Sequence, residues 1–250
     1  MLFGKYASRK SEARFPILWE NLVLSVPVSV QPPSGLTAYD FAGNRRPALS
    51  GTSLTAATAW SSSGSLVGLN FSAGNQQASY RTIDLGTTYS IAFRMFVRAD
   101  QTVVIGGAAS PQSYALYPHA SVGWYHTVQG TFTLHSSITD AAVPWLNRWT
   151  SACVVRRRTS VEWFVNGTSF GTQALGANNS MPLSTFSGFA GGSLCVNGML
   201  SEIAYWTRPI SASEAVVLHR YRNAVHVAKR RPIAFGGLGT NRRRRLLVGA

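Results

Sequence analysis

The sequence is poor in charged residues and in cysteine. Only 13% of its 250 residues are charged, and nine are acidic, whereas about a quarter of an average protein is charged. Cys153 and Cys195 have no C-x-x-C spacing, which argues against a cysteine-based metal site, and we interpret both as buried thiols rather than as a disulfide. The chain also lacks a run of about 20 apolar residues, so we expect no membrane-spanning helix and no membrane partner.

The N-terminal region lacks the continuous apolar stretch of a secretory signal peptide. Its basic residues, Lys5, Arg9, Lys10 and Arg14, are followed only by residues 22–30, where Ser25 and Pro27 interrupt the apolar sequence. A signal peptide needs an unbroken apolar segment after its basic start. We therefore expect no classical export signal.

The scarcity of acids also limits the chemistry that we expect. Glycoside hydrolysis needs two carboxylates that flank the scissile bond, which on one strand means acids two or four residues apart. Glu162 and Glu202 each stand alone, and no acidic cluster of that kind occurs. A Walker loop is missing as well. The G-x-S-x-G string at 167–171 begins in the predicted hairpin turn and not between a strand and a helix, so it does not indicate a nucleophile elbow. The sequence therefore predicts a protein that is not an enzyme.

Short β-prone segments make up most of the chain. They alternate with clusters of Gly, Ser, Asn and Pro, and this even spacing is typical of a β-sandwich or barrel. We predict strands at 65–72, 90–98, 102–105, 113–117, 126–135, 149–156, 160–165 and 194–206. Segments 15–19 and 23–30 could each add a strand, with Pro27 favouring a sheet edge. This pattern divides the chain into an N-terminal arm (1–34), a sandwich domain (35–225) and a basic C-terminal arm (226–250).

Two motifs near the end of the sandwich are the most informative. In VEWFVNGT (161–168), Asn166-Gly167 lies between apolar segments, which is a strong signal for a tight hairpin. GMLSEIAYWTRPISASEA (198–215) predicts a buried strand, and Ser211 with Glu214 then forms a capping box that starts a helix over 212–221. This order resembles the end of laminin-G-like, concanavalin A-like lectin domains, which have a hairpin of the form "lyvNG" before "G.idevriwnraLsaeEi..ly".

Upstream segments extend the resemblance over roughly residues 35–222. LTAYDFAGN (36–44), LNF (69–71), IDLG (83–86) and YSIAFRMFVR (89–98) follow the family pattern in order, and Trp149 starts a strand as it does in the family. Met95-Phe96 replaces the Trp that the family usually has there. The resemblance implies an all-β jelly-roll sandwich of two antiparallel sheets with one short C-terminal helix. It also implies that Glu202 is a structural acid that ties its strand to a neighbouring loop.

The resemblance makes calcium the cofactor to consider, with Asp40 and Asn44 as candidate ligands. Calcium takes six or more oxygens, usually including two carboxylates. Because no second acid lies nearby, we prefer an Asx-type turn in which Asp40 accepts backbone N–H groups. The five histidines are scattered and show no zinc-site spacing. We expect no required metal or other cofactor.

Most of the net charge of +14 lies at the two ends of the chain. Residues 220–250 contain nine lysines and arginines and no acid, whereas residues 17–219 are close to neutral. This C-terminal arm can be a solvated tail, a phosphate-binding arm or an arm that orders on a partner protein. Its candidate contact residues are Arg230, Arg231, Phe235, Arg242, Arg243, Arg244, Arg245, Leu246 and Leu247.

Aromatic residues cluster between positions 114 and 126. Their faces can stack on sugar rings, pack against a partner protein or fill the core. All three interpretations stay open for Tyr114, Tyr117, Trp124, Tyr125 and His126.

Together these features favour a non-enzymatic structural protein of a virus particle. Lectin-like domains with basic arms resemble proteins from the structural gene regions of tailed bacteriophages. We expect a capsid decoration, cement, tail or fibre module that lies in the virion, forms a homo-oligomer such as a trimer and contacts other virion proteins or a surface glycan. A cell-surface carbohydrate-binding module is the alternative. Nucleic acid is a further partner to test, because basic arms can bind phosphates.

Overall fold

The computed structural model describes most of the chain between residues 10 and 226. The described residues are 10, 13–31, 35–43, 45–64, 66–72, 75–100, 103–107, 114–176, 178–188 and 195–226. The candidate calcium ligand Asn44 lies outside them, as do all candidate contact residues of the C-terminal arm, from Arg230 to Leu247.

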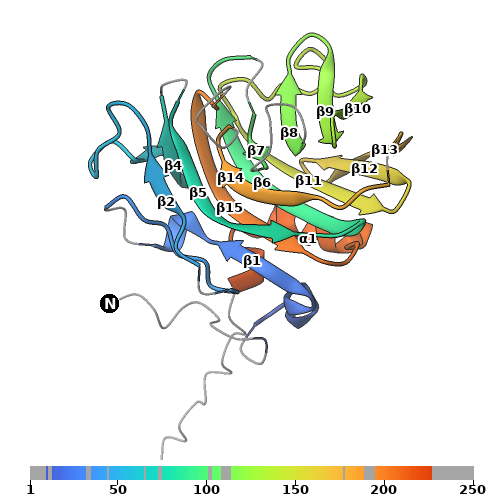
Figure 1. Cartoon of the computed structure of the whole chain (residues 1–250), viewed down its shortest axis with the longest axis horizontal. Helices are drawn as coiled ribbons and strands as arrows, with labels where there is room; N and C mark the ends of the chain where they lie inside the picture. Colours follow the sequence, from blue (N-terminus) through green and yellow to red (C-terminus); the bar gives the residue numbers. More distant parts are fainter. Residues whose placement is uncertain are drawn as a thin grey trace, which may run out of the picture.

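Two antiparallel sheets face each other in the described part of the chain (Figure 1). The eight-stranded sheet has the order β13 (Thr168–Ala174), β12 (Ser160–Val165), β11 (Trp149–Arg157), β6 (Thr88–Val97), β15 (Gly198–Trp206), β4 (Leu66–Phe71) and β3 (Trp60–Ser63), with β1 (Leu22–Val26) also paired to β15. The seven-stranded sheet has the order β10 (Thr131–His135), β9 (Gly123–Val128), β8 (Tyr114–His119), β7 (Ile105–Gly106), β14 (Pro182–Phe186), β5 (Gln77–Asp84) and β2 (Ala48–Ser50). This is the all-β sandwich that the sequence predicted.

The main core lies between the two sheets. Because side chains alternate along a strand, Ile91 and Phe93 of β6 point inward while Ala92 points to the other face. Trp124 of β9 enters the same core from the seven-stranded sheet. Each large apolar side chain buried in this way contributes roughly 1.5 to 3 kcal/mol to stability.

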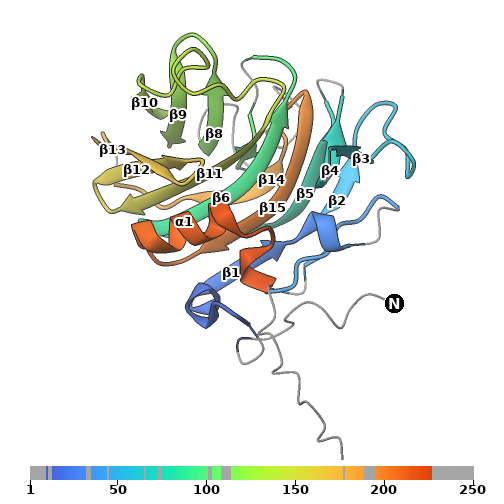
Figure 2. The ribbon, with the colours of Figure 1, turned by 180° about the vertical axis from the view of Figure 1, so that it is seen from behind.

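The outer face of the eight-stranded sheet is also covered. A second apolar cluster joins Trp206 and Phe164 of this sheet to Leu18, Ala215 and Val225. These last residues belong to three short helical elements, namely η3 (Pro16–Trp19), α1 (Ala212–Arg220) and η5 (Ala224–His226). Figure 2 shows α1 lying across this sheet. A further one-turn element, η4 (Val28–Val30), follows β1.

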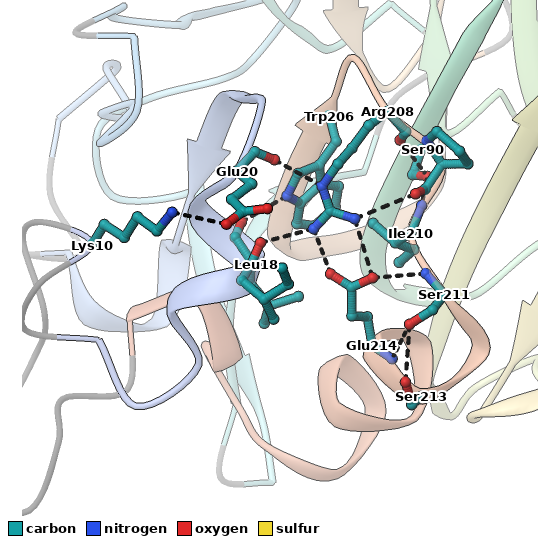
Figure 3. A network of polar contacts seen from close by, with 12 residues as sticks. Lys10, Leu18, Glu20, Ser90, Trp206, Arg208, Ile210, Ser211, Ser213 and Glu214 are labelled. Atoms are coloured by element: carbon teal, nitrogen blue, oxygen red, sulfur yellow. Dashed lines mark hydrogen bonds and ion pairs between the residues drawn. The ribbon is translucent and has the colours of Figure 1, made fainter.

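The two motifs that the sequence singled out form as predicted. Asn166 and Gly167 have left-handed φ values of 51° and 80° and join β12 to β13. Ser211 Oγ accepts the N–H of Glu214, and the Glu214 carboxylate accepts the N–H of Ser211 (Figure 3). The helix therefore begins where the capping box predicted, and it ends one residue earlier than the predicted 221.

The segment predicted as one strand at 126–135 is instead two strands. A turn at Gln129 and Gly130, with φ values of 48° and 76°, separates β9 from β10. Gly130 tolerates the left-handed conformation that this turn requires. The prediction was wrong because the apolar alternation continues on both sides of the turn and hides it.

The predicted N-terminal arm also differs from the structure. Residues 13–31 lie on the sandwich, where β1 pairs with β15 in the register Ser25 to Ala204. The predicted strand at 15–19 is a 3-10 helix that has Pro16 in its first turn, a position where the missing N–H of proline costs nothing. The part of the predicted arm that the structure describes therefore packs on the sandwich and adds one strand to it.

Candidate functional site

An aromatic strip lies on the outer face of the seven-stranded sheet. Tyr117 of β8 stands directly opposite Tyr125 of β9, and their rings stack at 4.6 Å with an interplanar angle of 12°. Phe132 of β10 extends the row, edge-to-face with Tyr125 at 6.3 Å and 87°. We call these three residues the aromatic strip.

The register of the three strands explains why these rings share one face. Tyr125 alternates with Trp124 and His126 along β9, so it points outward when they point inward. Phe132 pairs with Thr127, which is two residues beyond Tyr125 and on the same face. Phe132 is 45% exposed, and Tyr117 and Tyr125 are partly buried. The strip is therefore a surface feature with an apolar base.

Burial, together with a smaller effect of the neighbouring Tyr125, raises the pKa of Tyr117 to about 12. The Tyr117 phenol therefore keeps its proton at neutral pH. It offers a hydroxyl that can both donate and accept a hydrogen bond at the edge of an aromatic face. This combination of ring face and hydroxyl suits a ligand that has both C–H and O–H groups.

Two of the predicted contact residues lie in the core instead. Trp124 is 1% exposed and packs edge-on against Trp145 and Trp163, at 6.2 and 5.3 Å. His126 is fully buried, with Nε2 hydrogen-bonded to the hydroxyl of Tyr89. Both residues point between the sheets and cannot contact a surface partner, so their assignment to a contact site was wrong.

The remaining predicted residue, Tyr114, is half-buried against the main core. It pairs with Val128 at the far end of β8 from the stacked tyrosines. Phe132 was not predicted as a site residue. Its signal in the sequence is the Gln129-Gly130 turn, which places β10 beside β9 and brings Phe132 next to Tyr125.

Asp40 is saturated by hydrogen-bond donors. Its Oδ1 accepts the N–H groups of Ser25 and Ala42 at 2.8 and 2.9 Å. Its Oδ2 accepts the N–H of Gly43 at 3.0 Å and Nη1 of Arg45 at 3.2 Å. This is the Asx-type turn that we preferred, extended by an ion pair. Within the described residues, no group of three His, Cys, Asp or Glu side chains is placed to hold a metal ion.

The other acidic residues in the described part of the chain also have structural partners. Glu162, Glu202, Glu214 and Glu20 pair with basic side chains. The remaining three, Asp84, Asp100 and Asp140, accept backbone N–H groups.

A small cavity of about 30 Å³ lies beneath α1, and Arg94, Glu202 and His219 are among its lining residues. Nε of Arg94 donates to Glu202 at 2.5 Å, and Nη2 donates to the carbonyls of Leu218 and His219 at the end of α1. Glu202 therefore ties β15 to β6 and, through Arg94, to the helix. Burial raises the pKa of Glu202 although Arg94 opposes this shift.

Both cysteines are free thiols in the structure and both are buried. Burial raises the pKa of Cys195 to about 11 and that of Cys153 further. At neutral pH neither thiol ionises, so neither is poised as a nucleophile.

Comparison with known families identifies the fold. A family model described as the concanavalin A-like lectin/glucanases superfamily matches residues 71–216. No curated protein matches the chain. Within the described residues, no helix is long and apolar enough to cross a membrane.

Several solved structures are similar in fold at low sequence identity. Domain 4 of AbnA, a GH43 extracellular arabinanase from Geobacillus stearothermophilus solved with arabinotriose, is 13% identical with a TM-score of 0.56, and the match covers 78% of this chain and 97% of that one. The binding domain of Paraclostridial Mosquitocidal Protein 1 is 14% identical with a TM-score of 0.55, covering 81% and 52%. Trypanosoma rangeli sialidase is 12% identical with a TM-score of 0.52, covering 80% and 32%. The chain thus spans about half of the toxin domain and about a third of the sialidase.

Proposed function

Because the chain belongs to the concanavalin A-like lectin/glucanases superfamily, we propose that it is a non-enzymatic glycan-binding structural protein of a virion. In this proposal the aromatic strip contacts the glycan. The basic segments at the two ends of the chain attach the sandwich to other virion proteins, and the chain assembles as a homo-oligomer.

The exposed aromatic strip is the observation that carries the glycan-binding part of the proposal. Aromatic rings that stay partly open to solvent on a rigid sheet are suited to stacking on the C–H faces of sugars. Phe132 is 45% exposed and continues the stacked pair of Tyr117 and Tyr125. The fold is shared with an arabinanase domain solved with arabinotriose, so arabinose oligomers are the first glycans to test.

The absence of catalytic activity is supported by the positions of the acids. Catalytic carboxylates of glycosidases must be free to contact the sugar or a water molecule. Each acidic residue that the structure describes is instead held by a backbone N–H group or a basic side chain, as for Glu162 with Arg157 and Asp140 with the N–H of Trp145. We therefore expect that bound glycans are released unchanged.

A glycan array with the full chain tests this function. We expect signal for a defined group of glycans and loss of that signal in Tyr125→Ala and Phe132→Ala. Tyr39→Ala is the matched control, because Tyr39 is 44% exposed and lies outside the strip. Loss of glycan signal in Tyr39→Ala but not in the strip variants would place binding elsewhere.

The virion role is tested on purified particles. Mass spectrometry is expected to find the chain as a stoichiometric component, and deletion of residues 229–250 is expected to prevent its incorporation. The alternative, a cell-surface carbohydrate-binding module, is favoured by the same aromatic strip. It would be supported if the chain bound glycans and were found at a cell surface but never in particles.

A further inference from the structure

The two ends of the described chain meet on the outer face of the eight-stranded sheet. Nε1 of Trp19 donates to the carbonyl of Val225 at 2.7 Å, and Ser25 Oγ hydrogen-bonds Nε2 of His226 at 2.8 Å. The ring of Phe15 lies 4.9 Å from that of Tyr221. Residues 15–19 and 221–226 are thus side by side, and we call this contact the terminal junction.

Hydrogen bonds from Trp206 and Arg208 hold the terminal junction on the sandwich. Arg208 donates to the carbonyls of Ile17 and Glu20 at 2.8 and 3.0 Å while it pairs with Glu214 (Figure 3). Nε1 of Trp206 donates to the carbonyl of Leu18 at 2.7 Å. These bonds join β15, α1 and η3, so both ends leave the domain from a defined position.

Positive charge is concentrated in the segments that continue from this junction. Inside the described part of the chain, Lys10 pairs with Glu20 at 2.9 Å and Arg208 pairs with Glu214. Residues 1–9 carry Lys5 and Arg9 without an acid, and residues 227–250 carry seven lysines and arginines without an acid. Both basic segments are therefore attached to the sandwich at one place.

That place lies on the opposite side of the sandwich from the aromatic strip. The strand register places the strip on the outer face of the seven-stranded sheet, whereas the junction is on the outer face of the eight-stranded sheet, beside α1 (Figure 2). A partner that holds the junction leaves the strip facing away from it. This geometry suits a protein that is attached by one side and binds with the other.

We propose that the two basic segments, residues 1–9 and 227–250, bind together to one acidic surface of a partner protein. They act as one anchor because the terminal junction holds their starting points side by side. This proposal rests on the attachment role of the basic segments in the proposed function, and it adds that both segments engage one partner. Two segments that start from one point bind the same surface with a high effective concentration, so their affinities reinforce each other.

The residue types favour an acidic protein surface over nucleic acid. Six of the seven basic residues in 227–250 are arginines, and the guanidinium group binds carboxylates through two parallel hydrogen bonds. Phe235, Leu246, Leu247 and Val248 alternate with or follow these arginines. A protein surface offers apolar contacts to such side chains, whereas a phosphate backbone does not.

The test uses the full chain and a labelled peptide rich in glutamate and leucine, with duplex DNA of equal charge as the competing probe. We expect tighter binding of the peptide than of the DNA. Deletion of residues 1–9 or of residues 229–250 is expected to weaken peptide binding at least tenfold. Replacing Arg242, Arg243, Arg244 and Arg245 by lysine keeps the charge, and it is expected to weaken binding of the peptide more than that of the DNA.

A peptide with photoreactive groups at both ends tests the shared position of the segments. We expect one peptide to cross-link to residues 1–12 and 227–250 of the same chain. Cross-links to only one segment, or tighter binding of the DNA, would overturn the proposal. Thermal unfolding of each variant controls for folding. Glycan binding is measured on the same preparations, so loss of glycan binding with intact double cross-links would contradict the glycan role and leave the anchor standing.

Discussion

Arg94 and Glu202 form a buried ion pair between β6 and β15, with Nε of Arg94 2.5 Å from Oε2 of Glu202. The side chains are only 12% and 8% exposed. Glu202 has a left-handed φ of 53° and lies at a β-bulge in β15, which turns its carboxylate toward Arg94. Because Arg94 also holds the last carbonyls of α1, this pair connects the sheet to the helix.

Removing one partner of this pair is expected to destabilise the protein strongly. Glu202→Ala leaves the Arg94 charge buried without its carboxylate, which costs about 3 to 5 kcal/mol of unfolding free energy. Glu202→Gln keeps the shape and one acceptor, and a smaller loss is expected. Urea denaturation measures both. Equal stability of Glu202→Ala and the parent chain would contradict the role that we assign to this pair.

The stability of the sandwich is expected to fall in acid because of His126. Burial, with the nearby Arg156 charge, lowers the pKa of His126 to about 3, whereas an unfolded histidine titrates near 6.5. The folded state therefore excludes a proton that the unfolded state binds. This contribution is complete above pH 6.5 and is lost as the pH falls toward 3, at about 1.4 kcal/mol per pH unit.

His126→Gln keeps a hydrogen-bonding group for Tyr89 and removes this titration. Between pH 7 and pH 4, the unfolding free energy is expected to fall less steeply in the variant than in the parent chain. The difference in slope corresponds to about one fewer proton taken up on unfolding. Burial also lowers the pKa of His135 and His219, so the variant should keep part of the acid sensitivity. An unchanged slope would show that His126 takes up no proton on unfolding.

The β12–β13 hairpin provides a test of backbone geometry. Gly167 has a φ of 80°, and an added Cβ would lie 3.1 Å from the His219 ring. Gly167→Ala is therefore expected to cost roughly 1 to 2 kcal/mol for the left-handed residue, with a further loss for the crowding. Gly64→Ala is the matched control, since Gly64 has a φ of 61° and open space around its Cβ position. Equal unfolding free energies for the two variants would contradict the crowding.

Local motifs made the hairpin and the helix start predictable from sequence. Asn166-Gly167 specifies its turn through its own backbone, and Ser211 with Glu214 specifies its cap within one helical turn. The 3-10 helix at Pro16–Trp19 was missed because its main partners are distant in the chain, as in the bond from Trp206 to Leu18. A short segment does not encode such a contact by itself.

The aromatic site was only partly predictable for a different reason. Along β9, the consecutive residues Trp124, Tyr125 and His126 are all large. The sequence pattern therefore does not show which face of the strand points to the core. The pairing with β8 and β10 decides this, because it places Tyr125 between Tyr117 and Phe132. The sequence therefore indicated an aromatic cluster in this region but did not separate its surface residues from its core residues.

The bond between Trp19 and Val225 is expected to hold the terminal junction together. Trp19→Phe keeps an aromatic ring beside His226 and removes the indole N–H that reaches the Val225 carbonyl at 2.7 Å. We expect a loss of about 1 kcal/mol and faster amide hydrogen exchange in residues 221–226. Unchanged exchange in these residues would show that the bond does not hold the junction.

Calorimetric titration of the best array glycan into the full chain tests the central claim, that the aromatic strip binds glycan, most directly. We predict that Tyr125→Ala and Phe132→Ala each weaken binding about tenfold, which corresponds to roughly 1.4 kcal/mol. The control Tyr39→Ala is predicted to bind as tightly as the parent chain. Unchanged affinity in both strip variants would contradict the claim.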